Sequence, residues 1–247
     1  MSKKLTHPLK SLLLFSLLAA LTVLQTGCGG VIGSSQTVSL TKKVKDFSEV
    51  SIGSGFEGRI LYGEKFSVKL HVSQNLQRLV FVNVSEERLS IGLRSGVPVF
   101  GGTLKVTVTM PSLATLSVSG GSRVSVTGFQ AANKNTSFSI SGGSIVETDF
   151  SSHKVLVKLS GGSRFRGTLQ ATHIDLRSSG GGRIELTGSA ETLNVIGSGG
   201  SRFKLSRLNV QEAALSLSGG SYADINAEFV SDESLSGGSD YSNGELE

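Results

Sequence analysis

The sequence predicts an all-β protein: a right-handed parallel β-solenoid of about 19–20 residues per coil, preceded by an irregular β capping portion. Two observations indicate this class. A Ser-Gly-Gly motif recurs through the second half of the chain, and apolar residues stand at fixed distances on both sides of it. A short, nearly constant period is typical of repeat architectures. No stretch after residue 30 has a sustained helical period, so repeats built from helices are not expected.

The copies of the motif follow one another at intervals of 22, 19, 19, 19, 20 and 18, and they begin at Ser119, Ser141, Ser160, Ser179, Ser198, Ser218 and Ser236. We number positions in each coil from the first glycine of its motif. Position +4 holds an apolar or aromatic residue in every copy: Val124, Val146, Phe165, Ile184, Phe203, Ala223 and Tyr241. Position −4 is apolar in the first six copies and is Glu233 in the last. The same positions therefore point inward in each coil, which argues against a set of Gly/Ser linkers.

A coil of this length is too short to hold a helix, strands and turns, and it fits three short strands around a narrow core. The alternation of polar and apolar residues in 123–126 agrees with a strand. Glycine allows the backbone to turn with positive φ at each corner. We expect the corner serines to form a hydroxyl ladder from coil to coil, at a spacing of about 4.8 Å.

The solenoid is assigned to residues 116–247 and the cap to residues 38–115. Strand-like runs in the cap include 47–50, 66–72, 89–93 and 104–110. A cap is expected because the open end of a solenoid exposes unpaired backbone groups.

Residues 1–27 are predicted to be a signal peptide. Three lysines precede the apolar run 11–23, which is too short to span a bilayer comfortably. The segment Gln25-Thr26-Gly27-Cys28 resembles the lipobox of bacterial lipoproteins, so acylation of Cys28 is predicted. The alternative is a plain secretory cleavage site beside an incidental cysteine. Gly29 after the cysteine favours, by the same resemblance, the outer membrane, with residues 28–37 as a lipid-anchored tether.

The formal charge of +5 is partly a property of the leader. Without residues 1–27, which hold three lysines, 21 basic and 19 acidic residues remain, a net charge of +2. This balance does not favour a nucleic-acid partner.

Three segments, DFSEVSIGSGFEGRILYGEKFSVKLHVS, RLSIGL and LKVTVTMPSLATLSVSGGS, together with the later repeats, resemble the GIN domain family, the head domain of auto-transporter adhesins. The resemblance covers about residues 40–245. It implies a β-helical protein of the cell surface or periplasm, and it carries no catalytic motif to transfer.

Two rows of side chains are expected on the outer face, at positions that flank the buried +4 residue. The charge ladder, at position +5, alternates in sign: Ser125, Glu147, Arg166, Glu185, Lys204, Asp224 and Ser242. It is either a salt-bridge ladder that sets coil register or a recognition face. The arginine row, at position +3, contains Arg164, Arg183 and Arg202 on successive coils. It is either a solvated face or a site for an anionic ligand.

Two function classes remain open. The first is a non-catalytic interaction module of the cell envelope, adhesin-like, that binds extended polymers such as anionic polysaccharide, or envelope proteins. The second is a carbohydrate-processing β-helix enzyme, which typically needs two facing carboxyl groups. A compact cluster of acids in a groove would favour the enzyme, and uniform alternating ladders favour the binding module. His153 and His173 fall one position apart in their coils, and no metal or other cofactor is predicted.

Overall fold

The computed structural model describes residues 30–94 and 98–244, with the side chains of residues 131–133 excepted. The N-terminal elements are β1 (Val31–Ile32), β2 (Thr37–Lys42), β3 (Glu49–Ile52), β4 (Glu57–Tyr62), β5 (Ser67–Ser73), the 3-10 turn η1 (Gln74–Leu76), β6 (Val80–Ser85), β7 (Arg88–Leu93), β8 (Val99–Phe100) and β9 (Leu104–Met110). The C-terminal elements are β10 (Thr115–Val118), β11 (Arg123–Ile140), β12 (Ile145–Gly161), β13 (Arg164–Gly180), β14 (Arg183–Gly197), β15 (Arg202–Leu217), β16 (Tyr222–Leu235) and β17 (Asp240–Asn243).

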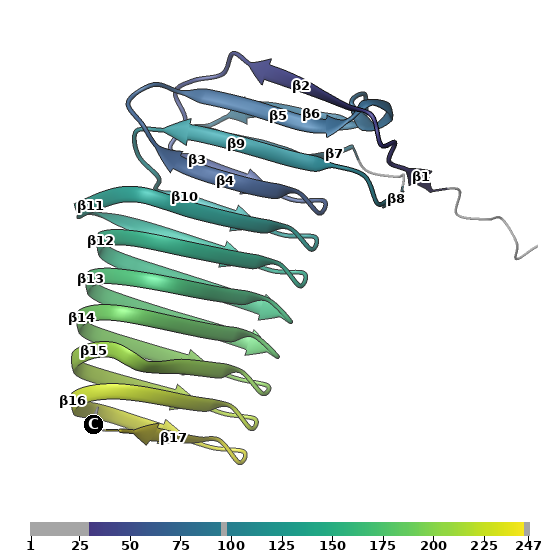
Figure 1. Ribbon diagram of the computed structural model, residues 1–247. Helices are drawn as coiled ribbons and strands as arrows, with labels where there is room; N and C mark the ends of the chain where they lie inside the picture. The colour runs from purple at the N-terminus through teal and green to yellow at the C-terminus, as the bar shows by residue number, and fades with distance from the viewer. Residues whose placement is uncertain (1–29, 95–97, 245–247) are drawn as a thin grey trace, which may run out of the picture.

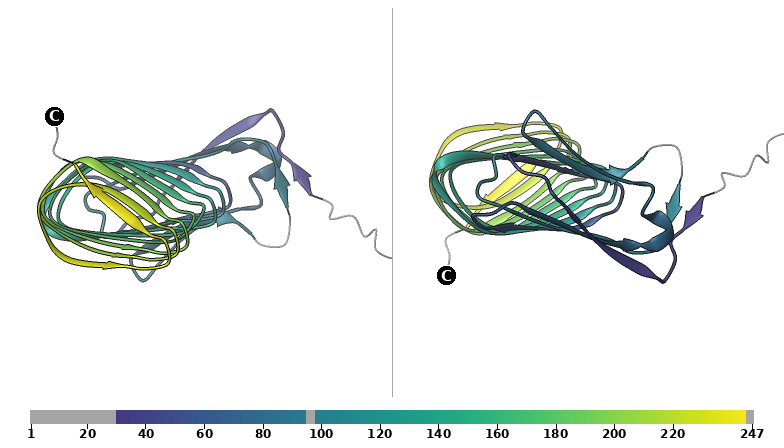
Figure 2. Two further views of the ribbon diagram at one scale, coloured as in Figure 1. Left: turned by 90° about the horizontal axis from the view of Figure 1, so that it is seen from below. Right: turned by 90° about the horizontal axis from the view of Figure 1, so that it is seen from above.

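The C-terminal elements form the predicted right-handed parallel β-solenoid. Each strand from β11 to β15 pairs in parallel with the next strand in sequence, so the coils stack in chain order (Figure 1). Each coil is one continuous strand of 14 to 18 residues, where the sequence suggested three short ones. Seen along its axis, the coil is a flattened ring with a sharp corner at one edge and a rounded arc at the other (Figure 2). The strand continues through the arc, so only the Ser-Gly-Gly corner breaks it.

The corner is a four-residue turn. In the first one, Gly120 and Gly121 have φ of 64° and 76°, and the amide of Ser122 donates to the carbonyl of Ser119. Positive φ at both central residues is the geometry of a type I′ turn, which glycine adopts without steric cost. The buried hydroxyl of Ser122 donates to the same carbonyl at 2.8 Å, and Ser163, Ser201, Ser221 and Ser239 repeat this bond. These five hydroxyls thus close their own corners, whereas the buried hydroxyl of Ser144 has no hydrogen-bond partner among the described residues. The expected ladder of hydroxyls between coils does not form.

Serine follows the Ser-Gly-Gly motif in six of the seven copies, and Gly182 takes its place in the other for a steric reason. A Cβ at this position would lie 2.3 Å from the hydroxyl oxygen of Ser178, which is buried in the row that other coils fill with Val118, Ile140 or Leu159. Glycine therefore makes room for a serine in the core.

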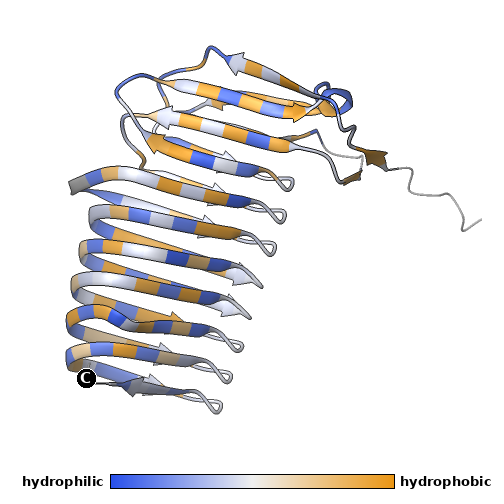
Figure 3. Ribbon diagram, in the orientation of Figure 1, coloured by the Kyte–Doolittle hydropathy of each residue, from blue (hydrophilic) through white to orange (hydrophobic). Residues whose placement is uncertain are grey.

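The core lies between the two flat faces of the coils. Residues at positions −4 and +4 are buried from β10 to β16, among them Phe138 and Phe165, whose ring centres are 5.1 Å apart. Hydrophobic and hydrophilic residues alternate along each strand in Figure 3, as one buried face and one solvated face require. Glu233 is the exception at position −4. Tyr241, at position +4 of the same coil, donates to it at 2.7 Å, so a polar pair replaces the apolar one there.

The solenoid begins earlier than residue 116. Strand β3 pairs in parallel with β10, and β4 pairs in parallel with β11. Ser54 and Gly55 lie between them with φ of 62° and 78°, in register with Gly120 and Gly121. This is a further corner of the same kind, with the sequence Gly-Ser-Gly in place of Ser-Gly-Gly. The predicted boundary between residues 115 and 116 therefore falls inside the stack.

The cap covers the N-terminal end of the stack with antiparallel pairs, β2 with β5, β5 with β9, and β6 with β7. The described part of the predicted tether, residues 30–37, lies against this cap. Asn75 binds it twice, accepting from the amide of Ser34 and donating to the carbonyl of Ile32, and Ser73 donates to the carbonyl of Ser34. These bonds fix the segment because its backbone groups find partners in the fold.

The predicted signal peptide, residues 1–27, and the predicted lipidation site, Cys28, lie outside the described residues. In residues 30–94 and 98–244 the structure has no helix that is long and apolar enough to cross a membrane.

Candidate functional site

The charge ladder has the predicted register. Glu147 pairs with Arg166, Arg166 with Glu185, Glu185 with Lys204, and Lys204 with Asp224. The structure extends the ladder toward the cap, where Ser125 pairs with Arg59 and Arg59 with Thr107 of β9. The backbones that carry neighbouring acids and bases of the ladder are therefore about 4.8 Å apart, the spacing between adjacent strands.

The arginine row also has the predicted register. Arg164 pairs with Arg183 and Arg183 with Arg202, and the row is bounded by Ile145 and Tyr222. Arg164 and Arg202 are exposed and Arg183 is half-buried. The nearest recorded acid is Glu185, whose carboxylate oxygen lies 3.9 Å from Nε of Arg183. Three guanidinium groups thus stand in line beside the charge ladder, two residues from it along each strand.

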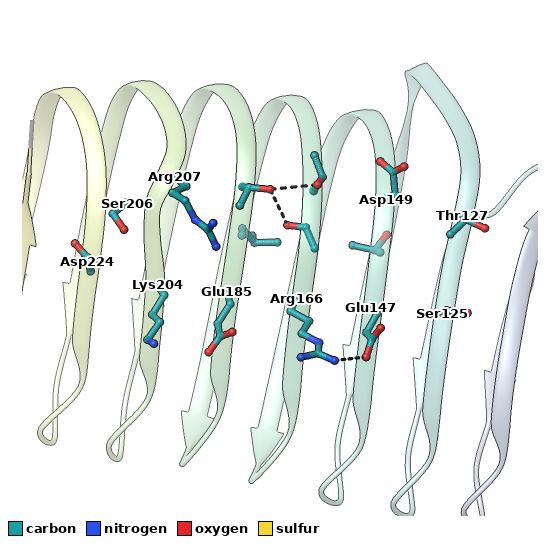
Figure 4. Close-up of a pocket in the computed structure, with 15 residues that line it drawn as sticks. Ser125, Thr127, Glu147, Asp149, Arg166, Glu185, Lys204, Ser206, Arg207 and Asp224 are labelled. Carbon is teal, nitrogen blue, oxygen red and sulfur yellow. Dashed lines mark hydrogen bonds and ion pairs between the residues drawn. The ribbon is translucent and has the colours of Figure 1, made fainter. Parts of the chain in front are cut away.

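The charge ladder borders a groove, which the sequence did not reveal. One hollow of about 710 Å³ crosses β11 to β16 and is lined by Ser125, Thr127, Glu147, Thr148, Asp149, Arg166, Gly167, Thr168, Glu185, Leu186, Thr187, Lys204, Ser206, Arg207 and Asp224 (Figure 4). A second hollow of about 420 Å³ shares Ser125 and Glu147 with it and continues to His71, Lys105 and Thr107 at the cap. We call the two together the trough.

At the floor of the trough, Gly167 has no side chain, which allows the backbones of two coils to approach closely. Gly167 has φ of +142°, and a Cβ there would lie 1.8 Å from the carbonyl oxygen of Thr148 on the preceding coil. Only glycine fits this approach. Thr148 is almost fully buried, and its hydroxyl has no hydrogen-bond partner among the described residues. The floor is therefore partly polar.

Charges along the trough are mixed. Arg166 donates to Glu147, and this bond together with the carboxylate charge raises the pKa of the guanidinium. Four carboxylates line the larger hollow, Glu147, Asp149, Glu185 and Asp224, which is a gathering of acids in a groove. Along the ladder, however, a base stands between each acid and the next, as a charge-balanced binding surface requires. The structure thus combines a gathering of acids in a groove, which would favour the enzyme, with an alternating ladder, which favours the binding module.

Two histidines that occupy different positions in their coils lie side by side in the structure. The rings of His153 and His173 are 5.3 Å apart and meet edge to face, and their Nδ1 atoms lie within hydrogen-bond distance of Thr172 and Thr192. They remain in different register rows, because His173 pairs with Lys154. In residues 30–94 and 98–244 no group of three or more His, Cys, Asp or Glu side chains could hold a metal ion.

Similar structures have the same fold. A putative adhesin from Parabacteroides distasonis ATCC 8503 is 19% identical and has a TM-score of 0.75, with 86% of this chain and 99% of that chain covered. A putative lipid binding protein from the same organism is 14% identical with a TM-score of 0.78, and covers 88% and 100% of the two chains. A putative adhesin from Bacteroides fragilis NCTC 9343 is 19% identical with a TM-score of 0.71, and covers 86% and 98%. At such identities the likeness concerns the fold alone.

No curated protein matches the chain. Residues 46–243 match the family described as "Putative auto-transporter adhesin, head GIN domain", in agreement with the resemblance found in the sequence. The match spans the whole solenoid and most of the cap, and the chain belongs to this family of GIN head domains.

Proposed function

We propose that this chain is a non-catalytic, adhesin-like interaction module of the cell envelope that binds an extended anionic polymer. The observation that carries the proposal is the trough. Its ladder runs from Asp224 through seven inter-strand steps to Thr107, or roughly 34 Å along the solenoid axis. A hollow of this length and shallow form suits a chain molecule that lies across many coils.

The arginine row supports an anionic polymer. Guanidinium groups bind carboxylate, sulfate and phosphate through paired hydrogen bonds, and they are more weakly hydrated than ammonium groups. Three on successive coils present the same contact at regular intervals. Each contact is weak, but several along one chain, and several anchored copies on one surface, add in free energy. The family and two of the three structural neighbours named above are described as putative adhesins, and adhesion needs no catalysis.

The test is binding of the purified full chain to polygalacturonate, alginate and neutral dextran at low salt and at about 0.15 M salt. The variant Arg164→Ser/Arg183→Ser/Arg202→Ser is expected to lose most binding to the acidic polymers. The control Lys43→Ser/Lys65→Ser/Arg78→Ser makes the same change in net charge at exposed cap positions outside the trough. Equal binding by the row variant and the wild type, or a preference for dextran, would exclude the arginine row as the site.

The envelope location in this proposal depends on lipidation of Cys28. Chemical analysis of the mature N-terminus tests this lipidation most directly. Acyl labelling is expected in the wild type, and Cys28→Ala should lose the label and leave the membrane fraction. Mass spectrometry that found an unmodified cysteine, or cleavage elsewhere, would favour the plain secretory alternative. Outer-membrane sorting is tested by separating the inner and outer membranes of the same cells.

A further inference from the structure

The coil of β15 departs from the regular pairing along the trough. On β15, Lys204 pairs with Glu185 of the preceding coil, but Arg207 rather than Ser206 pairs with Thr187. An extra residue has therefore entered β15 between these two pairs, as in a β-bulge. The shift continues toward β16, where Lys204 pairs with Asp224 but the next recorded pair is Asn209 with Asn226.

The bulge adds a side chain to the trough, because both Ser206 and Arg207 line the larger hollow. In a strand, a slip of one residue moves a side chain to the opposite face. Without the extra residue, Ser206 would take the place opposite Thr187 and Arg207 would fall on the other face. With it, Arg207 lines the larger hollow, and Figure 4 shows its side chain extending over the groove beside Lys204 and Glu185.

Two cations stand together here without internal partners. Arg207 and Lys204 are both exposed, and neither makes an ion pair or side-chain hydrogen bond among the described residues. Arg166, two coils away in the same hollow, is by contrast hydrogen-bonded to Glu147. The β15 end of the hollow therefore has uncommitted donors, and the β12 end has a satisfied pair.

Hydroxyl groups adjoin these cations. Thr168 and Thr187, on the two coils before β15, lie with their Oγ1 atoms 3.1 Å apart, and both line the hollow. A hydroxyl both donates and accepts, so this pair matches the hydroxyl groups of a sugar. The volume of about 710 Å³ is that of a small-molecule site and exceeds what a single inorganic anion fills.

We propose that Lys204 and Arg207 bind the anionic group of one acidic sugar unit, whose hydroxyl groups contact Thr168 and Thr187. The inference rests on the proposed function and names the unit that the trough selects, whereas the arginine row contributes general attraction along the polymer. Selectivity then comes from the irregular coil of β15, because its extra residue places Arg207 beside Lys204.

The test uses the purified full chain and a short probe, tetragalacturonate, which is too small to engage the arginine row and the whole trough at once. Lys204→Ser/Arg207→Ser is expected to weaken its binding at least about tenfold, since two charged contacts are lost. The control Lys43→Ser/Arg78→Ser removes the same charge from the cap and should bind as the wild type does. Methyl-esterified tetragalacturonate, which keeps its hydroxyl groups and loses its charge, should bind weakly to all three proteins.

Two further measurements distinguish the source of the anion and the role of the hydroxyls. Thr168→Val/Thr187→Val should weaken tetragalacturonate binding and leave inorganic phosphate binding unchanged. If the Lys204→Ser/Arg207→Ser protein binds the tetramer as tightly as the wild type, or if phosphate at equal concentration displaces the tetramer completely, the sugar site is wrong. The arginine-row variant tested on long polymers decides the proposed function separately, because it leaves both cations of the β15 site in place.

Discussion

Each coil of the solenoid reverses direction twice, and the two reversals are built differently. At the corner, one or two glycines with positive φ turn the chain within four residues, and the sequence repeats Ser-Gly-Gly. At the arc, the strand bends gradually while it keeps its pairing to both neighbouring coils. A sharp turn demands particular residues at particular places, whereas a gradual bend can be distributed over many residue types.

The arc is also where the coils differ from one another. Register shifts occur between β11 and β12, between β14 and β15, and between β15 and β16, all outside the corners. The corner thus holds the stack in register, and the arc side provides the variation on which a binding site can be built.

The largest losses of stability are expected when buried rings near the corner or toward the arc are removed. Phe165 lies next to the corner and Phe150 toward the arc, and both are buried. Phe165→Ala, Phe203→Ala and Phe150→Ala should each lower the free energy of unfolding by about 3–5 kcal/mol, because each removes a buried ring. Ser125→Ala on the outer face should change it by less than about 0.5 kcal/mol. Denaturant unfolding measures all four, and small, equal losses would refute the assigned faces.

The next largest losses of stability are expected from glycine-to-alanine changes, which should cost more on the arc side than at the corner. Gly188, on the arc side, has φ of +120°, and a Cβ would lie 1.9 Å from the carbonyl oxygen of Leu169. Gly188→Ala should cost about 3 kcal/mol or more, since strain and overlap add. At the corner, Gly143 has φ of +75° and open space for a Cβ, so Gly143→Ala should cost only about 1–2 kcal/mol. The reverse order of melting temperatures would contradict the steric account.

A smaller effect is expected from the charge ladder. Arg166→Glu removes the bond to Glu147 and places three acids on successive coils. Because the pair is exposed, the loss of stability should be small and should grow at low salt. Adding Glu147→Lys and Glu185→Lys restores the alternation and should restore the stability. Thermal unfolding of the triple variant at two salt concentrations checks this, and a failure to recover would mean that the ladder does not couple neighbouring coils.

The smallest effect concerns the polar pair in the coil of β16 and β17. The hydrogen bond from Tyr241 to Glu233 raises the pKa of the Tyr241 phenol, and burial and the nearby carboxylate charge act in the same direction. The bond contributes stability below the pKa of the unfolded phenol, near 10, and loses that contribution as the pH rises through the folded value. Absorbance titration should show one phenolate forming later than the others. Tyr241→Phe and Glu233→Gln should each abolish that late step.

Much of the corner could be predicted from the sequence, because backbone geometry imposes it. The periodic glycines fixed the register, and the register placed Arg164, Arg183 and Arg202 in one row and gave the charge ladder its order. The Gly-Ser-Gly corner at Ser54 escaped because a residue other than glycine occupies a position with positive φ. Its backbone conformation, rather than its composition, carries the similarity.

The charge ladder of the trough could be predicted, because it stands at the constant position +5, but the hollow beside it could not. Gly167 and Gly188 open close approaches between coils, but they stand at different distances from their motifs, +6 and +8. One signal was present. The interval from Ser198 to Ser218 exceeds each of the three preceding intervals by one, and the extra residue lies in the bulge that brings Arg207 to the trough.

The attachment of residues 30–37 to the cap bears on mechanical load. An acyl group on Cys28 would leave one residue, Gly29, before the described fold begins at Gly30, a span of at most about 7 Å. Tension between a held polymer and the bilayer would therefore reach the bonds of Ile32 and Ser34 to the cap first, and then β2. Strand β2 runs antiparallel to β5 through six consecutive pairs, from Thr37 with Ser73 to Lys42 with Val68. A pull at its N-terminal end, along the strand, loads these pairs in shear, so they resist together and do not open one after another. The cap, which closes the stack, would then also be the joint that withstands the force of adhesion.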